Sequence, residues 1–209
     1  MPFKLSKIIV VSTAEGVEQQ GTDKKWAFNI FQNNDIYFYI DKNNEYKSEK
    51  QMYIDSVSIE NIEVINSPQI GEIKAYMPNS SEGRMYSYAE DSIVDEVLKY
   101  NGATRSDSRN LKIGNQGGNI AIRFSNTGIE KYESNDDEQI VHDGTLIKKL
   151  EKTTDDIKFT VNFDFIIVIN KNKYKAKITL DLPCGDIVEN GTANYEKSDM
   201  KDIIFKREK

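Results

Sequence analysis

The stretch IKFTVNFDFIIVI, residues 157–169, carries the clearest structural signal in this chain. Its apolar side chains recur at every second position, and polar side chains fill most of the intervening positions in its first half. Because successive side chains of a β-strand point to opposite faces, this pattern predicts a long, half-buried strand. The polar segment NKNK (170–173) follows, and YKAKITLDL (174–182) then alternates in the same way. The two alternating segments predict a β-hairpin.

Several other segments alternate with the same period. KWAFNIFQ (25–32) and IYFYID (36–41) predict a second hairpin around NND (33–35), because Asn and Asp tolerate the backbone of tight turns. DSVSIENIEVI (55–65) predicts a strand with a β-bulge at Glu60-Asn61, where the apolar phase slips. LKIGNQGGNIAIRFSN (111–126) predicts two short strands around a glycine turn. Further strands are predicted in GEIKAYMP (71–78) and KDIIFK (201–206).

Many short strands separated by turns predict an all-β fold, an antiparallel β-sandwich of Ig-like or jelly-roll-like type. The segment DSIVDEVLKYNG (91–102) also has apolar residues at helical spacing. One short helix near residues 91–100 is therefore the alternative to a strand there. We expect a single elaborated sandwich over residues 1–209. Two small β domains, 1–79 and 84–209, joined through the polar segment PNSSEGR (78–84), are the alternative.

Composition excludes several classes of protein. The net charge is −6, and an acidic surface repels phosphate backbones, so no nucleic-acid partner is expected. A single cysteine excludes an intramolecular disulfide. No run approaches the roughly 18–20 apolar residues of a membrane helix, so no transmembrane segment is expected, and no signal-peptide pattern is present.

The cellular location is predicted from composition alone. The strand pattern begins almost at the first residue, so a signal or anchor trimmed from the chain is an open alternative. The Asn-, Lys- and Ile-rich, Cys-poor composition resembles that of exported proteins of low-GC Gram-positive bacteria. This resemblance favours an extracytoplasmic or cell-surface location over a cytoplasmic one.

The only cysteine, Cys184, and the only histidine, His142, are the residues on which a nucleophilic site could be built. Cys184 continues the inward phase of 174–182, which favours a core position. The segment PCGD (183–186) supplies a carboxylate rather than a cation, and no helix is predicted to begin there, which disfavours a thiolate. His142 is interpreted as a loop-edge residue hydrogen-bonded to a nearby backbone or to Asp143. A structural zinc site would need more His or Cys ligands.

Two further segments resemble ligand sites only weakly. The acidic residues Asp136, Asp137 and Glu138 offer oxygen ligands for calcium, although the glycine of an EF-hand loop is missing. Apart from this calcium alternative, no cofactor is expected. IGNQGGN (113–119) contains glycines, but the strand-like segment after it argues against a phosphate-binding loop, which should precede a helix.

Tyr37 and Tyr39 alternate with Ile36, Phe38 and Ile40 and are expected to face outward. Tyrosine rings on a rigid sheet can stack on sugars or pack against a protein partner. The sequence therefore predicts a non-enzymatic bacterial β-sandwich module, a surface or extracytoplasmic domain that binds a protein or glycan partner or serves in an assembly. The alternatives are a cysteine- or carboxylate-dependent hydrolase on a β scaffold and a carbohydrate-binding module that uses the exposed tyrosines.

Overall fold

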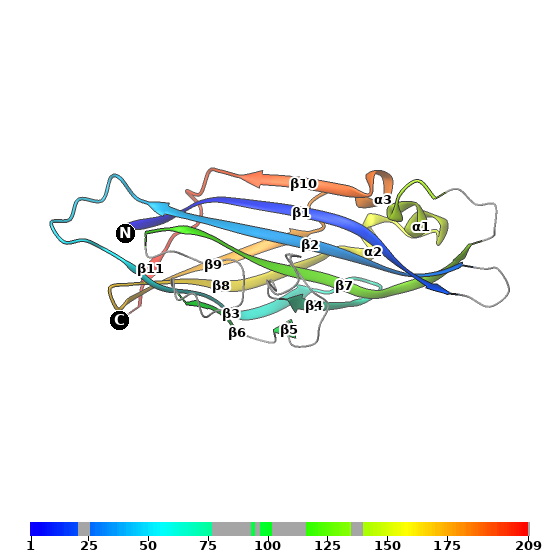
Figure 1. Cartoon of the computed structure of the whole chain (residues 1–209), viewed down its shortest axis with the longest axis horizontal. Coiled ribbons are helices and arrows are strands. Elements are labelled where there is room, and N and C mark those ends of the chain that lie inside the picture. The colour runs from blue at the N-terminus through cyan, green and yellow to red at the C-terminus, as the bar shows by residue number, and fades with distance from the viewer. Residues whose placement is uncertain (21–25, 77–92, 95–96, 102–115, 135–139, 209) are drawn as a thin grey trace.

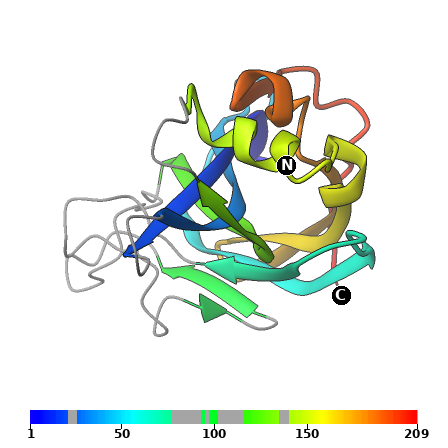
Figure 2. The ribbon, with the colours of Figure 1, turned by 90° about the vertical axis from the view of Figure 1, so that its right-hand side faces the viewer.

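The chain folds into an elongated β-sandwich, in which two antiparallel sheets pack face to face (Figure 1, Figure 2). The computed structural model describes residues 1–20, 26–76, 93–94, 97–101, 116–134 and 140–208. The expected antiparallel β-sandwich is confirmed.

The first sheet has the order β10 (Thr192–Lys197), β1 (Phe3–Gln20), β2 (Trp26–Lys42), β7 (Gly118–Ser134), β4 (Glu72–Tyr76) and β5 (Ile93–Val94). The second has the order β11 (Lys206–Arg207), β9 (Asn172–Leu182), β8 (Phe159–Ile169), β3 (Ile54–Asn66) and β6 (Val97–Asn101). Strands from the two sides of the segment 78–84 are hydrogen-bonded neighbours in both sheets, as with β10 beside β1 and β8 beside β3. A division at that segment would separate paired strands.

The hairpin expected from residues 157–182 is β8–β9, which pair in register from Phe159↔Leu182 to Ile169↔Asn172. Its two-residue turn is Asn170-Lys171, and both residues have positive φ, 44° and 66°, as such turns require. The strand β8 differs from the expectation in one respect, because its second face is also buried. β8 lies in the middle of its sheet, where side chains of the flanking strands cover Thr160 and Asn162.

The predicted hairpin around NND (33–35) is wrong. β2 runs without a turn from Trp26 to Lys42, pairing with β1 on one side and β7 on the other. Asn33 and Asn34 lie in mid-strand and are buried. The local preference of these residues for a turn is overridden by strand pairing, because the side chains of both asparagines form hydrogen bonds with the adjacent strands.

Other local predictions have mixed outcomes. The bulge in β3 is confirmed, since its pairing with β8 shifts between Glu60 and Glu63 and Asn61 has φ of 53°. Gly117 and Gly118 have positive φ, and the buried inward side chains after them match the expected phase, Ile120, Ile122 and Phe124. The helix alternative near 91–100 is wrong for the described residues there, which form β5 and β6; β6 pairs with β3. Residues 91–92, 95–96 and 111–115 lie outside the described part of the chain.

Three short helices gather at one end of the sandwich (Figure 1, Figure 2), and the sequence patterns did not predict them. They are α1 (Asp143–Lys149), α2 (Thr154–Ile157) and α3 (Ile187–Asn190). Asp186 caps α3 by accepting hydrogen bonds from two of its backbone N–H groups, and Gly191 ends it with φ of 73°. Over the described ranges, no helix is long and apolar enough to span a membrane.

Within the described part of the chain, the interior has two apolar clusters. The larger lies between the sheets and contains the rings of Phe38, Phe124 and Phe163; the Phe163 centroid lies 5.9 Å from that of Phe38 and 6.3 Å from that of Phe124. The smaller lies at the helical end. Its members are Ala14, Ile30, Ile129, Leu146, Ile147, Ile157, Ile187 and Val188.

We predict that Phe163→Ala lowers the free energy of unfolding by about 3–5 kcal/mol, because the substitution opens a cavity where rings from both sheets meet. Urea denaturation measures the loss. Ile204→Ala is the control, since its side chain is 66% exposed and should change stability by no more than about 0.5 kcal/mol. Equal effects of the two substitutions would contradict this packing.

Candidate functional site

Polar side chains form a band across β1, β2 and β7 of the six-stranded sheet, at matching positions along the three strands. We call this band the polar belt. The sheet register sets Ser12 opposite Asn34, Asn33 opposite Ser125, and Asp35 opposite Arg123. Its members are Ser12, Thr13 and Glu15 of β1, Gln32, Asn33, Asn34 and Asp35 of β2, and Arg123, Ser125 and Asn126 of β7.

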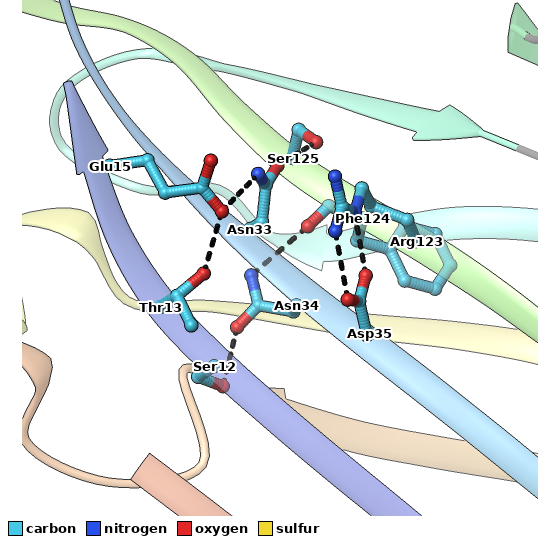
Figure 3. Close-up of polar contacts among 9 residues, drawn as sticks. All are labelled: Ser12, Thr13, Glu15, Asn33, Asn34, Asp35, Arg123, Phe124 and Ser125. Carbon is cyan, nitrogen blue, oxygen red and sulfur yellow. Dashed lines mark hydrogen bonds and ion pairs between the residues drawn. The ribbon is translucent and has the colours of Figure 1, made fainter. Parts of the chain in front are cut away.

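The inner face of the belt points between the two apolar clusters. Asn34 is fully buried; its Oδ1 accepts from the Ser12 hydroxyl at 2.7 Å, and its Nδ2 donates to the Phe124 carbonyl at 3.1 Å (Figure 3). Asn126 donates through Nδ2 to the Ile70 carbonyl at 3.0 Å. The Gln32 amide and the Asn126 Oδ1, also buried, have no hydrogen-bond partner in the described structure. The hydrogen-bonding groups of the belt are therefore satisfied at Asn34 but not at the neighbouring Gln32 and Asn126 Oδ1 among the described residues.

The outer face of the belt forms a separate network (Figure 3). Glu15 Oε1 accepts from the Thr13 hydroxyl at 2.9 Å and from Asn33 Nδ2 at 2.8 Å. The Ser125 hydroxyl donates to Asn33 Oδ1 at 2.5 Å. Through Asn33, side chains of all three strands are linked on this face.

Asp35 and Arg123 form a two-pronged ion pair on the outer face. Arg123 Nε lies 2.5 Å from Asp35 Oδ1, and Nη2 lies 2.8 Å from Oδ2. Both side chains are largely buried. Burial raises the pKa of Asp35 above its ordinary value, although the Arg123 guanidinium opposes that effect. Burial and the Asp35 charge raise the pKa of the neighbouring Tyr37 to about 12, so this hydroxyl stays neutral at physiological pH.

The tyrosines of the outer face are less open than the sequence suggests. Tyr37 and Tyr39 do alternate with the buried Ile36, Phe38 and Ile40, but both are only partly exposed. The Lys7 ammonium lies 4.7 Å from the centroid of the Tyr39 ring, so that ring already has a cation as a neighbour. Sugar or partner binding by Tyr37 and Tyr39 stays a prediction.

Cys184 lies at the inner edge of the belt, half-buried and packed against the larger cluster. Its backbone N–H donates to the Ser12 hydroxyl at 3.0 Å, and its thiol Sγ lies 3.3 Å from the Ala193 carbonyl oxygen. The thiol links the β9–α3 connection to β1 and β10. Contrary to expectation, a helix begins just after it, but the Asp186 carboxylate occupies the N-terminus of α3.

His142 immediately precedes α1 and joins it to α3. Its Nε2 lies 3.1 Å from the Glu189 carbonyl oxygen, which can only accept, so Nε2 carries the proton. The ring packs against Gly191, where a Cβ would come within 3.0 Å of it. The expected hydrogen bond from His142 to a nearby backbone group is present. Cys184 and His142 are not hydrogen-bond partners of each other.

The metal hypotheses remain predictions. Asp136, Asp137 and Glu138, the weak calcium candidates, lie outside the described residues. Within the described ranges, no group of three or more His, Cys, Asp or Glu side chains is placed to hold a metal ion.

A cavity of about 500 Å³ lies beyond the belt, where the β2–β7 ladder is interrupted. Ile30 pairs with Glu130, while Gln32 pairs with Asn126, so one residue of β2 stands opposite three of β7. The space beside Gly128 is open, since a Cβ there would meet nothing within 4 Å. The lining residues are Val17, Asn29, Ile30, Phe31, Thr127, Gly128, Glu130 and Lys131.

The sequence patterns missed the belt and the cavity, although one signal for the belt was present. Ile30, Ile36 and Phe38 have even residue numbers, as do Gln32 and Asn34 between them, so in one strand all five side chains point to the same face. An unbroken phase across NND is typical of one continuous strand rather than two strands joined by an odd-length turn. No pattern in the sequence marks the ladder interruption at Phe31.

We predict that Asn34→Ala lowers the free energy of unfolding by about 1–3 kcal/mol, because the Ser12 hydroxyl loses the Asn34 Oδ1 acceptor and the Phe124 carbonyl loses the Asn34 Nδ2 donor. In a double-mutant cycle with Ser12→Ala, the coupling should be about 0.5–3 kcal/mol. Chemical denaturation measures all four corners. Asn44→Ala, at an exposed position, is the matched control. Strict additivity of the two substitutions would argue against the Ser12–Asn34 bond.

A pH dependence follows from Asp35. Because its folded-state pKa is raised above 3.8, the folded chain holds this proton more tightly than the unfolded chain. The resulting stabilisation is fully present below pH 3.8 and is lost as the pH rises through the raised pKa. We expect the stability of the wild type relative to Asp35→Asn to fall over this interval. Tyr37→Phe, whose group titrates near 12, should show no such trend. A difference that grows with pH would overturn this assignment.

The sequence matches no protein-family model, and it has no match among curated proteins or among solved structures. A β-sandwich alone does not imply a function, because one architecture carries many activities. The function must therefore be inferred from the residues and geometry of the chain itself.

Proposed function

We propose that this chain is a non-catalytic binding module and that its binding site is the cavity at the interruption of the β2–β7 ladder. The observation that carries the proposal is the cavity itself. Its volume, about 500 Å³, lies within the range of small-ligand sites, roughly 300–1,000 Å³. It is built on the long strands β1, β2 and β7.

The lining residues favour an apolar ligand group. Val17, Ile30 and Phe31 provide an aliphatic and aromatic surface, and the exposed Glu130 and Lys131 supply charge of both signs beside it. Ligand sites combine an apolar lining with a few polar groups that fix orientation. We therefore propose that the cavity accepts an aromatic or aliphatic side chain of a partner protein. Val17 is 51% exposed, so its side chain is accessible to a ligand.

The contacts of Cys184 and His142 support the non-catalytic part of the proposal. The thiol links two segments of the fold, and the imidazole N–H bridges α1 and α3. A cysteine nucleophile needs a base within hydrogen-bond reach, about 2.6–3.2 Å; here each residue has other partners. A surface or extracytoplasmic setting fits a binding or assembly role and remains part of the proposal.

The test is a ligand-observed NMR titration with two sets of probes. N-acetyl-phenylalaninamide and N-acetyl-leucinamide represent apolar side chains, and glucose and N-acetylglucosamine represent glycans. We predict that the apolar probes bind the wild type and that Val17→Arg abolishes their binding, because a cation then occupies the apolar mouth of the cavity. Val141→Arg is the matched control, since Val141 is 76% exposed and is not a lining residue.

Two outcomes would count against the cavity. Apolar probes that fail to bind the wild type would remove the proposed ligand, and binding that survives Val17→Arg would move the site elsewhere. Binding of the sugars alone, lost in Tyr37→Ala or Tyr39→Ala, would favour the carbohydrate-binding alternative. Equal thermal midpoints of the two arginine variants would show that the loss of binding in Val17→Arg does not come from unfolding.

A further inference from the structure

The edge strand β10 has a row of backbone groups with no strand partner among the described residues. β10 is the outermost strand on its side, and it runs along the edge of the molecule in Figure 1. Unpaired N–H and C=O groups on such an edge are a template for another strand.

The register with β1 shows which groups point outward. Ala14 N–H donates to the Gly191 carbonyl at 2.9 Å, just before the first residue of β10. In an antiparallel ladder, residues point their N–H and C=O alternately to one neighbour and the other. Ala193 and Tyr195 therefore face β1. Thr192, Asn194 and Glu196 point their backbone groups away from the sheet.

We infer that β10 pairs with β10 of a second copy of this chain, antiparallel and about a two-fold axis at Asn194. Asn194 then faces Asn194 of the second copy, and Thr192 faces Glu196 in both directions. All three residues are in hydrogen-bonded positions, so each outward N–H meets an outward C=O. The two six-stranded sheets become one continuous sheet. This inference is independent of the ligand cavity.

The side chains of β10 favour the register centred on Asn194 over those centred on Glu196 or Thr192. Centred on Asn194, it pairs the Thr192 hydroxyl with the Glu196 carboxylate, an acceptable cross-strand combination. Centring on Glu196 would set two carboxylates directly opposite each other, which is destabilising. Centring on Thr192 would bring Asn194 against the end of α3 of the other copy. Among the registers centred on a residue with outward backbone groups, the segment is thus complementary to itself in this one, which favours a second copy as the partner.

Exposure along β10 fits this surface. Thr192, Asn194 and Glu196 are exposed, and the Tyr195 ring is 46% exposed. Tyr195 lies beside the two-fold axis, so pairing would cover part of both rings. Tyrosine gives large contact area at little cost in conformational entropy.

The first test is the mass of the protein in solution, measured by sedimentation equilibrium over a rising concentration series. We expect a monomer–dimer equilibrium in the wild type. Asn194→Pro should abolish the dimer, because it removes one outward N–H and places a ring on the edge. Asn194→Ala, the matched control, keeps the backbone N–H and should keep the dimer. Neither substitution removes a hydrogen bond of the monomer, so both should retain the wild-type circular dichroism spectrum.

The second test fixes the register. In a Cys184→Ala background, a mixture of Thr192→Cys and Glu196→Cys proteins should form a disulfide-linked dimer under mild oxidation. Paired Cα atoms in hydrogen-bonded positions lie about 5.5 Å apart, within the range that a disulfide spans. Each variant alone should stay uncrosslinked. A wild type that is monomeric at every concentration would overturn the inference, and so would a dimer that persists in Asn194→Pro or crosslinking of either variant alone.

Discussion

The pair of hydrogen bonds made by the Asn34 amide is the constraint on which the six-stranded sheet depends. A buried amide without partners costs free energy, whereas Asn34 satisfies Ser12 on one side and the Phe124 carbonyl on the other. This is possible in only one register of β1, β2 and β7. A slip of one residue would turn Asp35 toward the core and Asn34 toward the outer face of the sheet. The polar belt thus specifies the alignment that apolar alternation alone leaves open.

The belt also explains where the unusual features of the molecule lie. On one side of it the ladders are regular and the larger cluster fills the space between the sheets. On the other side the β2–β7 ladder breaks, the cavity opens, and α1 packs against β1 through the bond from Gly16 N–H to the Asp143 carboxylate. Cys184 is linked to the belt by the hydrogen bond from its backbone N–H to the Ser12 hydroxyl. Pro183 and Gly185 flank Cys184 at this junction, where the chain leaves β9 for α3.

The sequence allowed the architecture to be predicted wherever one interaction dominated. Alternation in 157–182 is strong because one face of each strand meets the core, and the β8–β9 hairpin follows from it. The prediction failed at NND, where three polar residues locally favour a turn but are paired by Ser12, Ser125 and Arg123, residues far away in the sequence. The short helices α1 and α3 were not predicted, because they are too short to show an apolar period and are stabilised by capping and by packing at the end of the sandwich. The cavity could not be predicted, since it depends on a mismatch in length between two paired strands.

The division of the interior into two apolar clusters has a consequence for how the chain opens. Cooperative unfolding requires contiguous packing, and here the buried polar residues Ser12, Gln32 and Asn126 interrupt it across the sheet. We therefore expect the helical end, with the smaller cluster, to open locally before the body of the sandwich. We expect the amide hydrogens of α1 and α3 to exchange with solvent through this partial opening, and those of β8 to exchange only when the whole molecule unfolds. The cavity lies beside the smaller cluster, with which it shares Ile30, so a partner bound there should slow the exchange of that end alone.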